Sequence, residues 1–119
     1  MNSTRPPRYD LDAAQRADVE ISTTCVRKAN ETLILDREQA ARRYVRDLFL
    51  SLVPGDFAHV EVMRPKAGRV IQGDVYGKVD SHGLWFIKFQ LDVRTVIMSC
   101  HEAEHDLKLA DGRTLWRRR

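Results

Sequence analysis

The spacing of apolar residues changes once along this chain, close to Gly55, and that change constrains the fold more than any other feature. Before it, apolar residues recur every three or four positions, which is typical of helices with one buried face. After it, apolar and polar residues alternate, which is typical of strands with one buried face. Helices followed by a run of strands predict an α+β fold, and 119 residues are the length of a single domain, 1–119.

The first half of the chain predicts three helices. One spans about Asp10 to Val19, a second runs from Thr23 towards Leu33, and a third begins after a cap at Asp36. The third helix ends at Pro54-Gly55 and carries one apolar stripe, formed by Ala41, Tyr44, Val45, Leu48, Phe49 and Leu52. We therefore assign residues 1–53 to a helical half.

The second half predicts a twisted antiparallel sheet of four or more strands over residues 56–102, with the N-terminal helices packed on one face. Short turns separate its strands, which are Phe57–Arg64, Val70–Val79, Leu84–Leu91 and Arg94–His101. Residues 103–119 form a C-terminal extension, in which Leu107–Leu109 and Thr114–Trp116 predict a last small hairpin.

Alternation along the strands assigns side chains to two faces. The face towards the helices is predicted to hold Val60, Val62, Ile71, Val75, Trp85, Ile87, Phe89, Leu91, Val96, Met98 and Cys100. The opposite, polar face is predicted to hold His59, Glu61, Gln72, Asp74, Tyr76, Phe86, Lys88, Gln90, Ser99 and His101, together with Ile97 and Met63. A half-solvated sheet normally has a polar outer face, so these residues alone do not specify a function.

This polar face has the groups that cleavage of RNA requires. RNA supplies its own nucleophile, the 2′-OH, so the protein needs only a base, an acid and positive charge on the phosphate, and no cofactor. We predict His59 and His101 as the base and acid, because histidine transfers protons near neutrality. Glu61 would act as a base or fix a histidine tautomer, and Gln72 and Tyr76 would orient the scissile group. Binding of the RNA backbone is predicted for Lys88, Arg64, Lys66, Arg69 and Arg94.

The strands also resemble a known family. The matching segments are Leu52-Val53-Pro54-Gly55-Asp56-Phe57, Gln72-Gly73-Asp74-Val75-Tyr76, Trp85-Phe86-Ile87-Lys88 and Val96-Ile97-Met98-Ser99-Cys100-His101. In order and spacing, from about Ala17 to Glu102, they are similar to the motility quorum-sensing regulator (MqsR) family of toxins, ribonucleases of type II toxin–antitoxin systems with a RelE-like fold. The resemblance implies an endoribonuclease that cleaves mRNA and is held inactive by a cognate protein antitoxin, with the ribosome as a further candidate partner.

The residues at the family's site positions differ in part. Lys88 matches a lysine of the family, whereas His59 and His101 stand where the family has lysines. A catalytic tyrosine of the family is replaced by Phe86, which cannot donate a proton, and the family's glutamine is displaced by one position to Gln72. The resemblance therefore implies a ribonuclease that uses histidines where its relatives use lysine and tyrosine.

Two alternatives stand beside this reading. His101-Glu102-Ala103-Glu104-His105 matches the zinc-peptidase pattern H-E-x-x-H, in which a helix would direct His101 and His105 at one metal ion while Glu102 activates its water. Against it, residues 95–98 favour a strand entering the motif. The other alternative is a non-catalytic RNA-binding or interaction module of the same fold, which the absence of the tyrosine at Phe86 favours.

The chain has neither an apolar run of the roughly 20 residues that a membrane span requires nor an apolar signal segment in MNSTRPPRYD. We therefore expect a cytoplasmic protein without a membrane partner. The formal net charge of +3 permits a polyanionic partner without requiring one.

Overall fold

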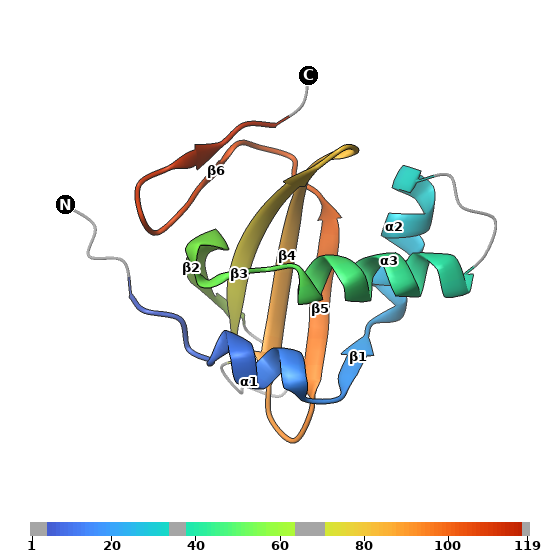
Figure 1. The fold of residues 1–119 in the computed structure, drawn as a ribbon, viewed down its shortest axis with the longest axis horizontal. Coiled ribbons are helices and arrows are strands. Elements are labelled where there is room, and N and C mark those ends of the chain that lie inside the picture. The colour runs from blue at the N-terminus through green and yellow to red at the C-terminus, as the bar shows by residue number, and fades with distance from the viewer. Residues whose placement is uncertain (1–4, 34–37, 64–70, 118–119) are drawn as a thin grey trace.

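The computed structural model describes residues 5–33, 38–63 and 71–117, and it shows an α+β domain (Figure 1). The described residues form three α-helices, α1 (Leu11–Arg16), α2 (Thr23–Leu33) and α3 (Glu38–Leu50), followed by the short 3-10 helix η1 (Pro54–Asp56). A strand lies between α1 and α2. The first helix is shorter than predicted because the chain becomes a strand at Val19. The predicted cap Asp36 lies outside the described residues.

The main sheet has five strands in the order β1-β5-β4-β3-β2. Their bounds are β1 (Val19–Ile21), β2 (Phe57–Met63), β3 (Ile71–Asp80), β4 (Gly83–Leu91) and β5 (Thr95–Glu102). The four predicted strands are thus confirmed to within a residue or two at most ends. A second, two-stranded sheet is formed by β6 (Leu107–Lys108) and β7 (Thr114–Leu115), which confirms the predicted C-terminal hairpin.

The sheet is mixed, so the prediction of a purely antiparallel sheet is wrong at one edge. β1 runs parallel to β5, with Val19 opposite Thr95 and Ile21 opposite Ile97. Three residues are too few for alternation to be recognised in a sequence, and this is why the strand was missed.

The helices α2 and α3 cover one face of the sheet (Figure 1), which we call the helix-facing side. Aromatic rings fill the space between the layers: the ring of Phe89 lies 5.0 Å from that of Phe49 and 5.6 Å from that of Tyr76. Asp80, at the end of β3, ties α3 to the sheet, because its carboxylate accepts hydrogen bonds from the Tyr44 hydroxyl and, at 3.0 Å, from Trp85 Nε1.

The opposite side of the sheet, which we call the outer face, is covered over one end only. There the C-terminal hairpin buries Leu107 and Leu109 in a second, smaller apolar cluster that includes Val75 and Leu84. The backbone of Gly77 allows this close packing, because a Cβ atom at that position would lie 2.5 Å from a methyl carbon of Leu107. The rest of the outer face carries no further layer in the described part of the chain.

The predicted assignment of faces is correct for most of β2 and β4 but wrong for β3. In the observed register Tyr76 lies opposite Ile87, whereas Val75 lies opposite Lys88. Gln72, Asp74 and Tyr76 are therefore on the helix-facing side, and Val75 is on the outer face. The side chain of Ile71 is outside the described part of the structure. Alternation does not report the face here because β3 is buried on both sides and contains Gly73 and Gly77.

The assignment also fails within β5. The pairing with β4 skips one residue, because Lys88 is opposite Ser99 while Phe89 is opposite Ile97, which leaves Met98 in a bulge. Ile97 and Cys100 consequently both pack towards the helices. Val96 lies on the outer face instead.

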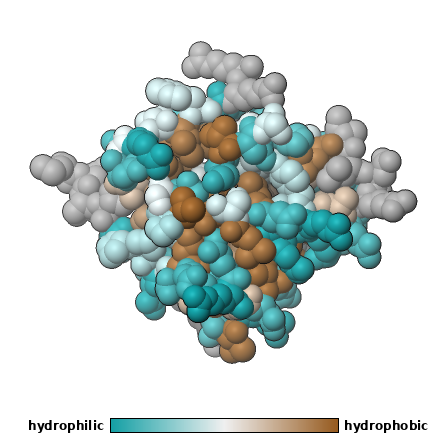
Figure 2. All heavy atoms as spheres, in the orientation of Figure 1, coloured by the Kyte–Doolittle hydropathy of each residue, from teal (hydrophilic) through white to brown (hydrophobic). Residues whose placement is uncertain are grey.

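The surface of the domain mixes polar and apolar atoms. Figure 2 shows apolar side chains in scattered patches between polar ones on the face seen in Figure 1. The exposed large apolar residues include Leu50, Val53 and Val62. None of the described helices is long and apolar enough to cross a membrane.

Candidate functional site

Five of the polar residues predicted for one face do share the outer face, next to the part that the C-terminal hairpin covers. His59, Val75, Lys88 and Ser99 form one row across β2, β3, β4 and β5. Glu61 lies two residues from His59 along β2, and His101 lies two residues from Ser99 along β5. We call this set the outer cluster: His59, Glu61, Lys88, Ser99 and His101.

Glu61 connects the first half of the cluster. Its Oε1 atom lies 3.0 Å from Lys88 Nζ, and its Oε2 atom lies 3.8 Å from His59 Nε2. The Lys88 side chain is only 11% exposed, whereas the side chains of Glu61 and His59 are 38% and 46% exposed. The carboxylate therefore neutralises a nearly buried ammonium while it also faces an accessible imidazole.

Gly73 makes this ion pair possible, and the sequence analysis did not identify its role. Lys88 is on β4 and Glu61 is on β2, so the lysine must cross β3 to reach the carboxylate. It passes over Gly73, where an added Cβ would lie 2.9 Å from Lys88 Cγ and 2.7 Å from Met98 Cε. A glycine inside a strand is the sequence signal for such a close approach.

His101 forms the second half of the cluster. Its ring stacks on Phe86, with the ring centres 5.1 Å apart and an angle of 16° between the planes. Its Nδ1 atom lies 2.9 Å from the carbonyl oxygen of Glu102. A carbonyl oxygen only accepts hydrogen bonds, so Nδ1 carries a proton, and in the neutral ring the lone pair is on Nε2.

The two histidines do not contact each other. The strands β3 and β4 lie between them, which places their backbones about 14 Å apart across the sheet, given the usual strand spacing. The Lys88 backbone lies between them on β4, but its side chain crosses β3 and places the ammonium beside Glu61, on the strand of His59. The cluster thus has a cation and one imidazole near Glu61 on β2, and a second imidazole on β5.

The structure separates Gln72 and Tyr76 from these histidines, so the prediction that all four share one face is wrong. Both lie on the helix-facing side of β3. Tyr76 is 1% exposed and packs between Phe57 and Phe89, with ring centres 5.5 Å and 5.6 Å away. Neither side chain can orient a group bound at the outer cluster.

The predicted RNA-binding residues are only partly placed. Lys88 is in the cluster. Arg94 precedes β5, whereas His101 is near its other end, so the two lie about 20 Å apart along the strand. Arg94 is exposed and lies 3.9 Å from Glu20. Arg64, Lys66 and Arg69 are outside the described residues.

The helix that the zinc-peptidase alternative requires is not formed. β5 continues through Glu102, and residues 103–106 lead from it into β6, so His101 and His105 are not on one face of a helix. Among the residues that the structure describes, no three His, Cys, Asp or Glu side chains lie close enough together to hold a metal ion. Burial raises the pKa of both the Cys100 and the Cys25 thiols. The sulfur atoms are therefore neutral core atoms.

No protein-family model, curated protein or solved structure matches this chain. The resemblance described from the sequence thus stays a prediction, and the functional assignment depends on the geometry of the outer cluster.

Proposed function

We propose that this protein is an endoribonuclease that cleaves mRNA by attack of the 2′-OH on the adjacent phosphate, without a metal ion. The observation that carries the proposal is the presence of His59, Lys88 and His101 together on the outer face. An open sheet surface can accept an extended RNA strand, and the three groups supply the two proton transfers and the positive charge that this reaction needs.

His101 is assigned to the proton transfer at the 2′-OH. Its Nδ1–H donates to the Glu102 carbonyl, so in the neutral ring the lone pair is on Nε2, where it can accept a proton. Stacking on Phe86 restricts the orientation of the ring. Phe86, which stands where related toxins have a tyrosine, thus acts as a positioning residue for His101.

His59 is assigned to the leaving 5′-oxygen, and Lys88 to the phosphate. Glu61 faces both, at 3.8 Å from His59 Nε2 and 3.0 Å from Lys88 Nζ. An accessible imidazole can donate the proton that the leaving oxygen requires. Because the Lys88 ammonium is already paired, a phosphate that binds there must share it with Glu61.

The proposed toxin role implies two partners, an RNA substrate and a protein inhibitor. We propose that mRNA in the cytoplasm is the substrate and that a protein antitoxin blocks the reaction, in line with the resemblance to the MqsR-like toxins and their RelE-like fold. An antitoxin that covers the outer cluster would exclude RNA from it. The ribosome is a further candidate partner, which a ribosome-dependent assay would identify.

A non-catalytic RNA-binding module is the second candidate function, and one contact favours it. The His101 ring and Phe86 already form a stacked pair, which could serve as a platform for a base. In that case the histidines would contribute to affinity and no bond would be broken.

The test is incubation of the purified protein with a defined single-stranded RNA, with and without EDTA, followed by mapping of the product ends. We expect cleavage that survives EDTA and leaves 2′,3′-cyclic phosphate. His101→Gln and His59→Gln should each lower the cleavage rate by about 10²-fold or more, the usual contribution of an acid or base. His105→Gln is the matched control, because His105 is exposed and outside the cluster.

Three outcomes separate the candidates. Loss of cleavage in His101→Gln alone would remove His59 from the mechanism and leave His101 with Lys88. Binding of the RNA without cleavage, weakened by Phe86→Ala, would establish the non-catalytic module. Neither binding nor cleavage, with or without ribosomes, would refute the proposal.

A further inference from the structure

A second candidate site lies on the helix-facing side of the sheet, away from the outer cluster. It is a groove of about 590 Å³ between the N-terminal segment with α1 and the loop that contains η1. Its walls are mainly apolar, and its lining includes Tyr9, Leu11, Leu52, Val53 and Pro54. This volume is within the range of about 300–1,000 Å³ that is usual for sites of small molecules.

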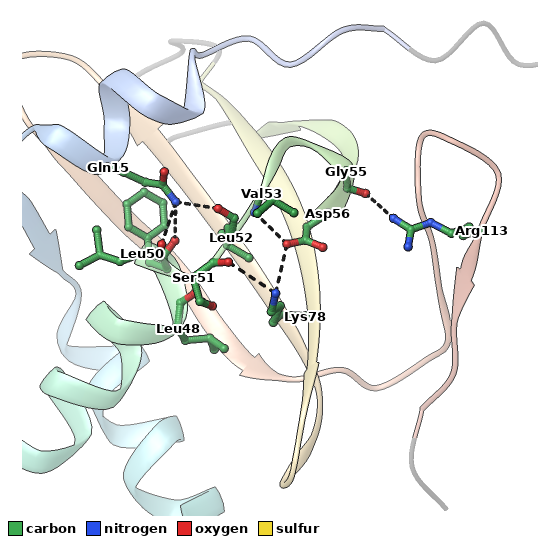
Figure 3. A network of polar contacts seen from close by, with 11 residues as sticks. Gln15, Leu48, Leu50, Ser51, Leu52, Val53, Gly55, Asp56, Lys78 and Arg113 are labelled. Carbon is green, nitrogen blue, oxygen red and sulfur yellow. Dashed lines mark hydrogen bonds and ion pairs between the residues drawn. The ribbon is translucent and has the colours of Figure 1, made fainter.

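Hydrogen bonds hold one wall of this α1–η1 groove in place. Gln15, on α1, directs its Nε2 atom at three carbonyl oxygens where α3 ends: Leu52 at 2.9 Å, Phe49 at 3.1 Å and Leu50 at 3.3 Å (Figure 3). The last carbonyl groups of a helix have no partner within it, so a side chain from another element can satisfy them. Gln15 therefore fixes the distance between α1 and the end of α3.

The η1 loop is held from its other side (Figure 3). The Asp56 carboxylate accepts a hydrogen bond from the Val53 backbone N–H at 2.9 Å and lies 3.6 Å from Lys78 Nζ. Arg113, from the C-terminal hairpin, donates to the carbonyl oxygen of Gly55 at 2.9 Å. The loop is thus attached to both β3 and the hairpin, and the groove is preformed rather than produced by mobile parts.

Two polar side chains that line the groove, those of Tyr76 and Asp10, have no hydrogen-bond partner among the described residues. Tyr76 is 1% exposed and lines the groove, yet within the described part of the chain its hydroxyl makes no hydrogen bond. Asp10 also lines the groove, and its side chain does not cap α1. Burial raises the pKa of the Tyr76 phenol, and the carboxylates of Asp74, Asp10 and Asp56 raise it further, so the hydroxyl stays protonated and can both donate and accept.

We infer that the α1–η1 groove binds a small molecule with an apolar body and a protonated amine. The apolar walls would take the body of the ligand, Asp10 would pair with the ammonium group, and the Tyr76 hydroxyl would accept a hydrogen bond from it. The other carboxylate at the rim, Asp12, pairs with Arg16 at 2.8 Å. A carboxylate and a hydroxyl that line one apolar groove, and that have no partner in the described part of the chain, favour a cation and disfavour an anion.

The test is an NMR titration of the full chain with three probes that share a phenyl ring and differ in the polar group: phenethylamine, phenethyl alcohol and 3-phenylpropionate. For phenethylamine we expect saturable shifts of the backbone amides of Leu11, Gln15 and Val53, with a dissociation constant of about 1 mM, which is usual for a ligand of this size. The amide of His101 should not shift. The alcohol should bind about fivefold more weakly, and the carboxylate more weakly still.

Three variants sharpen the test. Asp10→Asn should remove the preference for the amine over the alcohol, and Tyr76→Phe, which loses one oxygen atom, should weaken both. Val53→Trp should fill the groove and abolish all binding without disturbing the core, because Val53 is 52% exposed. Absence of saturable shifts at the groove for all three probes would overturn the inference. Equal binding of amine and carboxylate, or binding unchanged by Val53→Trp, would overturn it as well.

This inference does not depend on the proposed ribonuclease activity, because the two sites are on opposite sides of the sheet. RNA cleavage and phenethylamine binding can each be lost without the other, so the two assays fail separately.

Discussion

The two sides of the sheet are buried in different ways. On the helix-facing side, α2 and α3 cover an aromatic core in which Tyr76 and Phe89 are fully buried. On the outer face, the short hairpin β6–β7 covers one end with aliphatic side chains, and the polar cluster begins where that cover stops. Phe86 lies at this boundary, since it packs against the hairpin cluster and stacks on His101. The helix-facing side thus contains the larger buried core, whereas the outer face leaves the side chains of His59 and Glu61 partly accessible to solvent.

The largest effect we predict is on the helix-facing core. Phe89→Ala should lower the free energy of unfolding by about 3–5 kcal/mol, because it removes a buried ring that contacts Phe49 and Tyr76. Urea denaturation monitored by circular dichroism would measure it. The matched variant is Phe86→Ala, on the same strand but half-buried on the outer face, which should cost clearly less. Equal losses would show that the two sides contribute alike.

The second effect concerns the hairpin. Leu109→Ala should lower the free energy of unfolding by about 2–4 kcal/mol and increase hydrogen exchange over residues 103–117, because Leu109 is 2% exposed and anchors the hairpin to the outer face. Leu50→Ala, at an exposed leucine on α3, is the control and should change stability by less than about 0.5 kcal/mol. Unchanged exchange in Leu109→Ala would mean that the hairpin is held by other contacts.

The third effect is in the outer cluster. Glu61→Gln should lower the free energy of unfolding by about 1–2 kcal/mol, because it leaves the nearly buried Lys88 ammonium without its counter-charge, although exposure of the carboxylate reduces the loss. Glu20→Gln is the control, since Glu20 pairs with Arg94 at the surface and both side chains are more than half exposed. If the two variants lose the same stability, the cluster is an ordinary surface ion pair.

The smallest effect is a dependence on pH. Burial raises the pKa of Asp74 above its ordinary value of 3.8, although its carboxylate accepts hydrogen bonds at 2.8 Å from the backbone N–H groups of Arg8 and Tyr9. The folded protein therefore holds this proton to higher pH than the unfolded chain. The stability that Asp74 contributes is fully present below pH 3.8 and decreases as the pH rises through the raised pKa.

Unfolding measured between about pH 3 and pH 7 would detect this effect. The free energy of unfolding of the native protein should fall relative to that of Asp74→Asn as the pH rises. Asp111→Asn should show the opposite dependence on pH, because hydrogen bonds from the Arg113 backbone N–H and side chain lower the pKa of Asp111. The stability that Asp111 contributes is therefore lost as the pH falls. A difference for Asp74→Asn that does not change with pH would contradict the assignment.

Much of the fold could be predicted from the sequence because its signals are local. The apolar stripe of α3 and the turns at Asp80-Ser81-His82-Gly83 and Asp111-Gly112 mark elements that the structure confirms. The strand β1 could not be predicted, because its extended conformation depends on pairing with β5, which is far away in the sequence. The faces of β3 and β5 could not be predicted either. β3 is buried on both sides, so its polar and apolar residues do not alternate, and in β5 the bulged residue Met98 reverses the alternation.

The candidate site could also be predicted only in part, namely where the faces of the strands were assigned correctly. His59, Glu61, Lys88 and His101 lie on strands where alternation holds up to the bulge or resumes after it, and they are together on the outer face as expected. Gln72 and Tyr76 were misplaced with the rest of β3. The role of Gly73 could not be predicted, because it depends on the Lys88 side chain, which passes over Gly73 from another strand.

The pairing of β1 with β5 also has a consequence for biosynthesis. Val19 cannot meet Thr95 until the strand that contains Thr95 has left the ribosome, and the backbone of Tyr9 likewise waits for Asp74. The helices, which are synthesised first, have no sheet to pack on until then. Contacts between such distant parts of a chain slow folding. We expect the nascent chain to keep its apolar stripes exposed for most of its synthesis, and to become resistant to protease only after β5 has emerged.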